Sequence, residues 1–186
     1  LMSSHGRSAK DHLLAALEGA GDLAYMWELA SDALRLYGAS LPRLGLAIDD
    51  PDALATGESF TARIHADDRV LRQKRLEAHT ARGEPFECEY RLRTDAGAQV
   101  WVQERGRVDF DQRGHAKRLS GVLRLITGRK TEEQRLERLA NHDELTGHFN
   151  RTRLREALDH VIATSLRSGL KGAYLAIGID KLATVN

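Results

Sequence analysis

The sequence predicts an α+β fold in which an antiparallel sheet is flanked by helices. Three observations lead to this prediction. Apolar and polar side chains alternate between Phe86 and Arg93, as in a strand with one buried face. Two further strand-like stretches follow after tight turns, as in an antiparallel meander. Segments with apolar residues at helical spacing lie on both sides of these strands.

The first expected helix covers residues 8–19, because leucines recur there at helical spacing and Gly19 ends the pattern. These leucines are Leu13, Leu14 and Leu17. Their stripe must be covered by the following domain or by a second copy of the chain, and the sequence leaves both alternatives open.

Two short strands are expected next, at residues 23–29 and 33–37. The stretch 38–59 is rich in proline and aspartate, and we expect it to be irregular with one or two short helices. Asp67 and Asp68 predict the N-cap of a helix that continues to about residue 82, since aspartate is a favourable N-cap.

The meander is expected to comprise strands at 86–92, 100–110 and 117–126, separated by turns at 95–97 and 111–114. Beyond the meander, residues 128–141 are highly charged and predict a helical connector. Its main apolar side chains are Leu136 and Leu139.

A further amphipathic helix is expected at residues 150–168, followed by a buried strand at 173–179. A strand of this kind needs neighbouring strands, so we expect the last segment to be only part of a second domain.

Composition excludes several classes of protein. Of the 186 residues, 41% are hydrophobic and 30% are charged, which supports a sizeable core. A net charge of +1 argues against nucleic-acid binding through bulk positive charge. The single cysteine, Cys88, excludes an internal disulfide framework and a multi-cysteine zinc site. No apolar run approaches the roughly 20 residues that span a bilayer, and no signal peptide is visible. We expect a cytoplasmic protein without metal, nucleic-acid or membrane partners.

Residues 20–127 resemble a PAS domain of the bacterial sensory-box type. The matching segments are 64–68, 86–92, Asp95, Gly97, Trp101, Gly121, Ile126–Thr127 and Arg129–Lys130. The resemblance implies a PAS fold, with an antiparallel sheet and flanking helices, that leads into a signalling helix. Leu125 stands where such domains usually carry an aspartate before Ile-Thr.

Residues 139–147 and 149–151 resemble the first segment of a GGDEF domain, the fold of cyclic-di-GMP synthases, and 176–186 resemble its first strand. The fold class therefore becomes a PAS fold with a helical linker and a partial α/β GGDEF segment. The implied domains are an N-terminal helix (1–19), a PAS domain (20–127), a signalling linker (128–141) and the start of a GGDEF domain (142–186).

Three positions of the second resemblance decide its implied chemistry. Gly178 replaces the aspartate that binds magnesium in active cyclases, and Ala183 replaces a phosphate-contacting lysine. Asn186 matches the residue that hydrogen-bonds guanine. Phosphoryl transfer requires metal ions to neutralise charge. The resemblance therefore implies a catalytically inactive GGDEF domain that can still bind GTP, without a catalytic residue in this chain.

The resemblance implies a PAS–GGDEF–EAL parent that hydrolyses cyclic-di-GMP and whose activity the PAS domain regulates. The alternatives are an active diguanylate cyclase, a sensor that holds haem or another redox or gas-sensing cofactor, and a pure dimerisation or docking module. Partners of a docking module would be a response regulator or a proteolysis adaptor. Leu13, Leu14, Leu17, Leu136 and Leu139 suggest a homodimer through the N-terminal and linker helices.

Single residues have competing interpretations. Cys88 is expected to be a small core residue rather than a flavin or redox thiol, since Glu87 and Glu89 would raise its pKa. His79 could line a PAS pocket or bind haem, and we favour an ordinary structural role. His65 is expected to be a loop or capping residue. Of the two tryptophans, Trp27 is the more plausible pocket residue, and the alternative is that it packs in the core or forms a dimer contact.

Overall fold

The computed structural model of the protein describes residues 3–38, 41–46, 54–169, 171, 173 and 175. The chain forms two compact units, Leu1–Thr131 and Glu132–Asn186.

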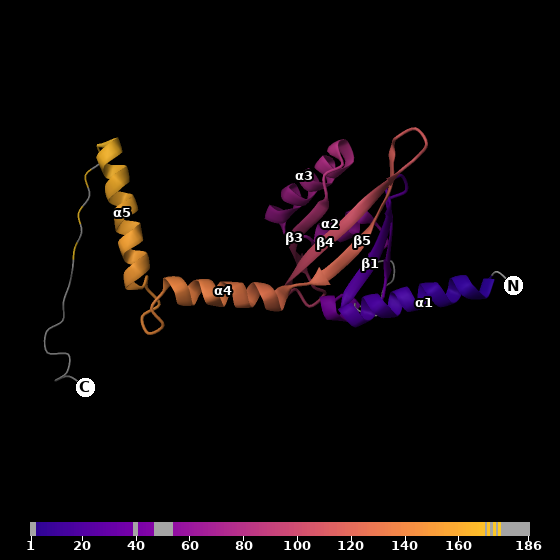
Figure 1. Ribbon diagram of the computed structural model, residues 1–186, viewed down its shortest axis with the longest axis horizontal. Helices are drawn as coiled ribbons and strands as arrows, with labels where there is room; N and C mark the ends of the chain where they lie inside the picture. The colour runs from indigo at the N-terminus through magenta and orange to yellow at the C-terminus, as the bar shows by residue number, and fades with distance from the viewer. Residues whose placement is uncertain are drawn as a thin grey trace. The chain divides into compact units, whose positions relative to one another are not determined.

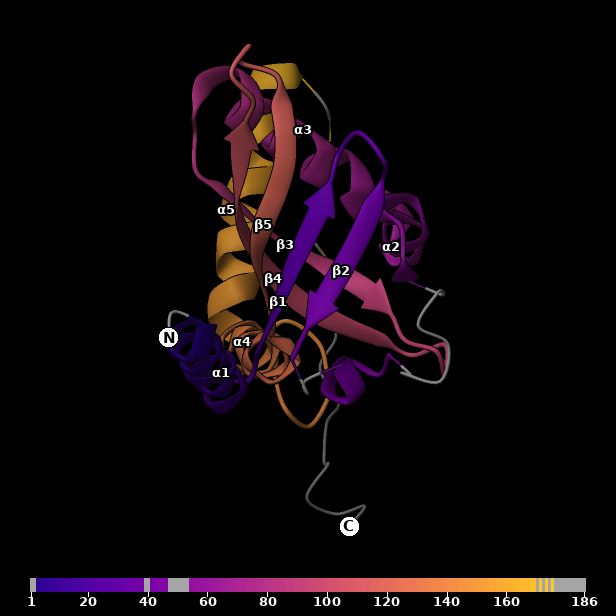
Figure 2. The ribbon, with the colours of Figure 1, turned by 90° about the vertical axis from the view of Figure 1, so that its right-hand side faces the viewer.

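The first unit is built around a five-stranded antiparallel sheet (Figure 1), and its strand order is β2-β1-β5-β4-β3 (Figure 2). Strands β3, β4 and β5 are the predicted meander, and β1 adds to its β5 side. The strands are β1 (Asp22–Glu28), β2 (Ala33–Tyr37), β3 (Phe86–Arg93), β4 (Gln99–Phe110) and β5 (Ala116–Leu125).

The helices of the described chain agree in type with the sequence pattern, although the first is longer than expected. They are α1 (Ser3–Ala20), the 3-10 helix η1 (Leu41–Leu44), α2 (Gly57–Arg63), α3 (Ala66–Arg82), α4 (Thr127–Asn141) and α5 (Arg151–Ser168). Helices α2 and α3 lie against one face of the sheet (Figure 2), and the core lies between them and the strands.

The buried face of the sheet follows the predicted alternation. In β3, Cys88, Tyr90 and Leu92 are buried, whereas Glu87 and Arg93 are exposed. Burial of these apolar side chains provides the main driving force for folding of this unit. The period of two in the sequence thus identified the inner face of β3 correctly.

The beginning of α3 confirms one prediction and corrects another. His65, which was expected to be a loop or capping residue, is the N-cap in place of the Asp67–Asp68 pair, and its ring Nδ1 accepts the N–H of Asp67 at 3.3 Å. The two aspartates lie in the first turn, where Asp68 accepts hydrogen bonds from Arg91 on β3. The helix ends as expected at Gly83, whose φ of 69° lies in the left-handed region.

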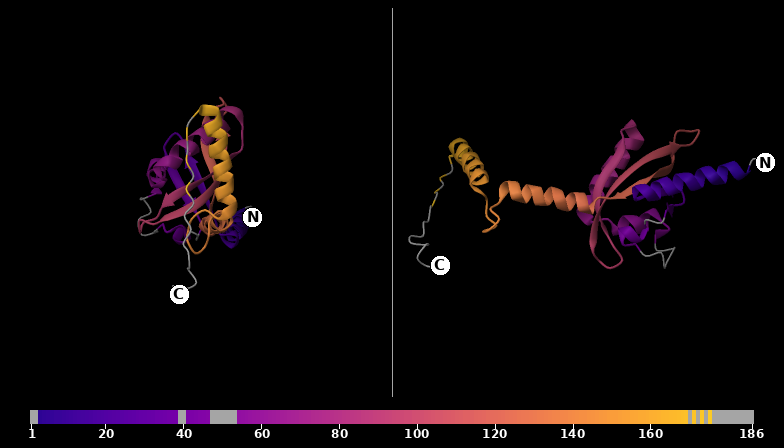
Figure 3. Two further views of the ribbon diagram at one scale, coloured as in Figure 1. Left: turned by 90° about the vertical axis from the view of Figure 1, so that its left-hand side faces the viewer. Right: turned by 60° about the horizontal axis from the view of Figure 1, so that its bottom comes forward.

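The helix that precedes the sheet and the helix that follows it meet at the same end of the sheet. Asp22 at the start of β1 is paired with Arg124 near the end of β5. The Asp22 carboxylate accepts two hydrogen bonds from the Arg124 guanidinium, each 2.7 Å long. Figure 3 shows α1 leading into β1 and α4 starting directly after β5.

In the second unit, the loop before α5 is held by local hydrogen bonds. His142 and Phe149 form an isolated antiparallel bridge, and the Asn150 side chain caps α5 by accepting the N–H of Arg153 at 2.9 Å. The expected strand at 173–179 lies mostly outside the described residues. Ala173 and Leu175, its two described members, have no regular secondary structure.

Candidate functional site

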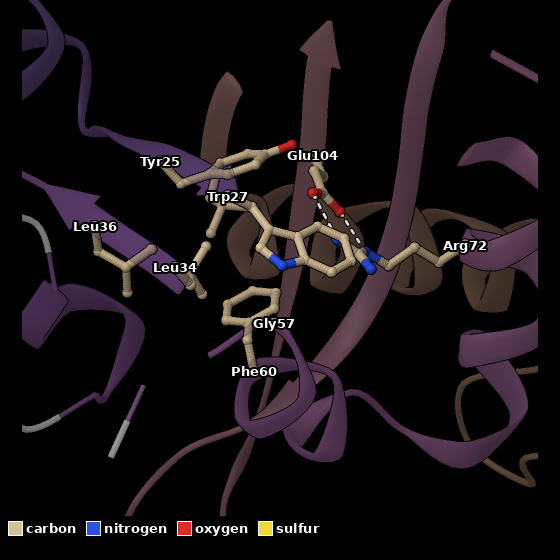
Figure 4. Close-up of a pocket in the computed structure, with 9 residues that line it drawn as sticks. Tyr25, Trp27, Leu34, Leu36, Gly57, Phe60, Arg72 and Glu104 are labelled. Carbon is tan, nitrogen blue, oxygen red and sulfur yellow. Dashed lines mark hydrogen bonds and ion pairs between the residues drawn. The ribbon is translucent and has the colours of Figure 1, made fainter. Parts of the chain in front are cut away.

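A buried ion pair lies between α3 and the inner face of the sheet. The Arg72 guanidinium donates to both carboxylate oxygens of Glu104 on β4, at 2.7 and 3.0 Å (Figure 4). The two side chains are only 7% and 1% exposed. Burial alone would lower the pKa of Arg72, but the Glu104 carboxylate raises it above its ordinary value. Arg72 therefore stays charged in the core, where it depends on Glu104 for compensation.

Aromatic rings surround the buried guanidinium. The Arg72 Cζ atom lies 5.8 to 6.0 Å from the ring centroids of Trp27, Phe60, Phe86 and Tyr90. Such contacts stabilise a desolvated cation through the negative faces of the rings. The cation is thus held by strands β1 and β3 and by helix α2 as well as by Glu104.

Two buried phenols lie close to the same carboxylate. The hydroxyl groups of Tyr25 and Tyr90 make no hydrogen bond of normal geometry within the described residues, although the Glu104 carboxylate lies near both. Burial, together with the Glu104 carboxylate, raises the pKa of both phenols above the ordinary value, so both remain protonated donors. A buried hydroxyl without a well-formed hydrogen bond is energetically costly, and Tyr25, which lines the cavity, therefore favours a small hydrogen-bond acceptor there.

A small cavity opens beside the pair, between β1, β2 and α2 (Figure 4). Tyr25, Trp27, Phe60, Arg72 and Glu104 are among its lining residues. The space that admits the centre of a water molecule is about 10 Å³, which is room for about one water molecule. A larger ligand would therefore require its walls to move.

The Trp27 side chain, which forms one wall of the cavity, is bonded to the turn between β1 and β2 and packs against α2. Its indole N–H donates to Asp32 at 2.8 Å, and the same carboxylate accepts the backbone N–H of Glu58 at 3.1 Å. Asp32 holds this position with a φ of 57°. A Cβ atom on Gly57 would overlap the indole ring of Trp27, so glycine permits the close approach of α2.

Cys88 is buried beside the ion pair, with its Sγ 3.9 Å from Glu104 Oε2. Burial, with the nearby carboxylate, raises the pKa of the Cys88 thiol to about 12. At about pH 8, only about one molecule in 10,000 would carry a thiolate. We expect iodoacetamide to leave Cys88 unmodified in the folded protein and to alkylate it in concentrated urea, as measured by intact-mass spectrometry. Rapid alkylation of the folded protein would show that the thiol is accessible and activated.

His79 lies at the end of α3 and is not among the residues that line this cavity. Its Nε2 accepts the backbone N–H of Val108 at 3.0 Å, and its Nδ1 contacts the carbonyl oxygen of Glu84. A haem ligand would have to give up one of these bonds. Ligand pockets of typical size are about 300–1,000 Å³, far larger than the cavity, so these residues as arranged do not fit haem. The geometry gives His79 a structural role.

The start of α4 is bonded to strands β3 and β4 of the sheet. The Thr127 hydroxyl accepts the N–H of Trp101 at 2.8 Å, and the Ile126 N–H donates to the Trp101 carbonyl at 2.8 Å. Glu89 on β3 accepts hydrogen bonds from Arg129 at 2.5 Å and forms an ion pair with Lys130 at 2.7 Å. We refer to Glu89, Thr127, Arg129 and Lys130 as the α4 latch.

The latch supplies the polar attachment that Leu125 cannot provide. Lys130 and Arg129 lower the pKa of the Glu89 carboxylate, so it is ionised at neutral pH. The latch therefore exists above the ordinary carboxylate pKa and is lost only as the pH falls through the lowered value. The Trp101 ring also lies 5.2 Å from the Lys130 ammonium and 5.6 Å from the Arg91 guanidinium.

Of the predicted site residues, the structure brings only Trp27 to the cavity. In the described residues that were expected to form a dimer contact, Leu13, Leu136 and Leu139 are exposed and Leu17 is half-buried. The side chain of Leu14 lies outside what the structure describes, and so do Gly178, Ala183 and Asn186. The homodimer and the GTP site therefore stay predictions.

The sequence pattern did not identify Arg72, Glu104, Tyr25 and Tyr90 as parts of one site. A signal for Glu104 was present, because it shares the alternation of the buried Val102 on β4. A charged residue at an inward position requires a buried partner.

The chain is similar to known sensory proteins. Residues 46–123 match the family model of the PAS fold. The chain is 28% identical over 139 residues to the uncharacterized protein y4lL of Sinorhizobium fredii, a match that covers 71% of this chain and 17% of the relative. It is 26% identical over 132 residues to the sensor protein FixL of Bradyrhizobium diazoefficiens, covering 71% of this chain and 26% of FixL. The chain thus spans only a minor part of these relatives.

Solved structures show the same fold. A sensory box histidine kinase/response regulator from Burkholderia thailandensis has 28% identity and a TM-score of 0.57, over 66% of this chain and 90% of that chain. The N-terminal domain of a diguanylate cyclase with a PAS/PAC sensor from Marinobacter aquaeolei has 18% identity and a TM-score of 0.51, over 59% and 98%. The chain therefore contains a PAS sensory domain of the kind found in signalling proteins, which confirms the first resemblance. None of the helices in the described part of the chain is long and apolar enough to span a membrane.

Proposed function

We propose that this chain is the sensory module and output connector of a protein that controls cyclic-di-GMP turnover. In this proposal the parent is a phosphodiesterase whose GGDEF domain is catalytically inactive but binds GTP. The observation that carries the proposal is the α4 latch, because it joins the PAS sheet to the helix that leads into the GGDEF-like segment 139–151.

The input site of the proposed sensor is the cavity beside Arg72 and Glu104. Glu104 and Trp101 lie on the same strand, β4, with Glu104 facing the cavity and the Trp101 backbone bonded to Thr127. A ligand that displaces the walls of the cavity would therefore act on the strand that holds the start of α4. Signalling of this kind requires two discrete arrangements of α4, whose populations the sensor shifts.

A buried donor in the cavity favours a small polar input molecule. Tyr25, which lines the cavity, offers its phenol hydroxyl, and the charge of Arg72 is already balanced by Glu104. A small neutral hydrogen-bond acceptor would satisfy this donor without an unpaired charge in the core.

The test of this function is the variant Glu89→Gln in the full-length protein. Loss of partly exposed ion pairs lowers the free energy that favours the latched arrangement of α4 by up to about 1 kcal/mol. A change of about 1 kcal/mol alters the ratio of two states about fivefold. We expect cellular cyclic-di-GMP, measured by mass spectrometry, to change about two- to fivefold. The direction reports which state of α4 the latch favours.

The matched control is Glu87→Gln. Glu87 lies on the same strand and accepts hydrogen bonds from Gln103 and Arg105 within the sheet, without a contact to α4 among the described residues. Cyclic-di-GMP at the wild-type level in both variants would refute the proposed role of the latch.

A further inference from the structure

A second hollow, distinct from the inner cavity, lies where α2 gives way to α3 beside the ends of β3 and β4. It offers about 200 Å³ to water-sized spheres. We refer to it as the arginine hollow, because it is lined by Arg63, Arg69, Arg91 and Arg93 together with His65. None of its lining residues is acidic.

The positive charge of the arginine hollow is only partly balanced by neighbouring carboxylates. Arg63 forms an ion pair with Asp95, and Arg91 forms one with Asp68 at 2.7 Å and a longer one with Asp67 at 3.5 Å. Asp67 Oδ2 also lies 3.5 Å from the His65 ring. Arg69, by contrast, donates to the backbone carbonyls of Ala62 and Ile64, at 2.8 Å each. These carbonyl bonds hold the Arg69 guanidinium in place without neutralising it.

Arg93 is the second unbalanced cation. Its side chain is exposed and forms no hydrogen bond or ion pair with any residue in the described part of the chain. It extends from the end of β3 into the same hollow as Arg69. Arg93 can therefore donate to a ligand without breaking a hydrogen bond or an ion pair, and Arg69 is already fixed beside it.

We propose that the arginine hollow binds the phosphoryl groups of a small soluble ligand, with a diphosphate as the group that fits. Guanidinium groups recognise phosphate oxygens through paired, charge-assisted hydrogen bonds. The lining also includes Ala66, the first residue of α3, so the positive end of this helix dipole faces the site. A concave site of this size favours a compact anion over a nucleic-acid strand, which requires an extended basic surface.

The location of the arginine hollow connects it with the output helix, and this connection rests on the proposed function. Arg91 lines the hollow, and its guanidinium lies over the Trp101 ring that also contacts Lys130 of the α4 latch. An anion that draws Arg91 away from Asp68 would therefore change the contacts of the ring beside the start of α4.

The proposal is tested by isothermal titration calorimetry of the intact chain with sodium pyrophosphate. We expect a dissociation constant of about 0.1–1 mM in near-physiological salt. Arg93→Gln should weaken binding several-fold, and Arg93→Glu should weaken it about tenfold or more, because it places a carboxylate in the hollow. Because the Arg93 side chain forms no hydrogen bond or ion pair within the described residues, both variants should keep the wild-type melting temperature.

The matched controls are Arg107→Gln and Arg107→Glu. Arg107 is an exposed residue of β4 that does not line the hollow, and the substitutions make the same change in net charge. Both controls should bind pyrophosphate with wild-type affinity. Equal weakening by the Arg93 and Arg107 variants would show that only bulk charge attracts the anion and would overturn the proposal, as would the absence of binding heat.

A second arm separates a soluble ligand from a lipid headgroup. In flotation assays with vesicles of phosphatidylcholine and phosphatidic acid, we expect the chain to remain unbound. Vesicle binding without pyrophosphate binding would replace the soluble ligand by a membrane surface and so refute the proposal. The Glu89→Gln experiment reads cyclic-di-GMP instead of pyrophosphate binding, so the two proposals can fail separately.

Discussion

Replacement of Glu104 by alanine is expected to lower the free energy of unfolding by about 3–5 kcal/mol. The substitution leaves the Arg72 guanidinium in the core, where it is 7% exposed and surrounded by aromatic rings. Neither Cys88 nor the phenol of Tyr25 can supply the lost negative charge, because burial raises the pKa of both groups. The loss should appear as a lower urea midpoint in tryptophan fluorescence, since both tryptophans of the chain, Trp27 and Trp101, lie in the PAS domain.

The double variant Arg72→Met/Glu104→Met provides the matched control. It removes both charges and keeps similar volumes, and replacement of a buried pair by apolar side chains is often neutral or stabilising. We therefore expect it to recover most of the stability lost in Glu104→Ala. If the free energy of unfolding of Glu104→Ala lies within about 1 kcal/mol of the wild-type value, the pair is hydrated in solution and the description of the core is wrong.

Substitution of Gly121 by alanine is expected to lower the free energy of unfolding by about 3 kcal/mol or more, which is a large effect for a single methyl group. Gly121 lies in the middle of β5, opposite Tyr25 on β1 and Gly106 on β4. A Cβ atom there would overlap the carbonyl oxygen of Arg105 and lie 2.8 Å from both the Gly106 Cα and the Tyr25 ring. Because two of these three neighbours are backbone atoms, the strands themselves must shift.

The same substitution at Gly128 should have the opposite sign. Gly128 lies in the first turn of α4, and no atom lies within 4 Å of a Cβ built there. Alanine is favoured over glycine in helices by up to about 1 kcal/mol, so Gly128→Ala should be neutral or stabilising. Equal urea midpoints for Gly121→Ala and the wild type would show that the sheet accommodates the methyl group without strain.

The sheet was predictable from sequence because its signals are local. The alternation in β3 and the glycine-containing turns at Gly97 and Gly114 each act within a few residues. The aspartates were assigned to the N-cap of α3 incorrectly for the same reason, whereas the capping role expected for His65 is confirmed. Asp67 and Asp68 are favourable cap residues locally, but Asp68 lies in the first turn, where it accepts a hydrogen bond from Arg91 on β3 at 2.8 Å.

The site was harder to predict because its partners are distant in sequence. Arg72 and Glu104 lie 32 residues apart, and Glu89 meets Arg129 across 40 residues. Each residue alone resembles an ordinary surface charge, and only the fold brings the partners together. The inward position of Glu104 was readable from strand parity, whereas nothing in the sequence pattern singled out Glu89 over Glu87.

The Asp22–Arg124 contact has a consequence for engineering. Two hydrogen bonds of 2.7 Å hold the start of β1 beside the end of β5, so the two ends of the sheet domain are neighbours. Domains with adjacent termini tolerate insertion into other proteins. We therefore expect that residues 20–127 can be inserted as a domain between two helices of an unrelated receptor without changing the distance between those helices.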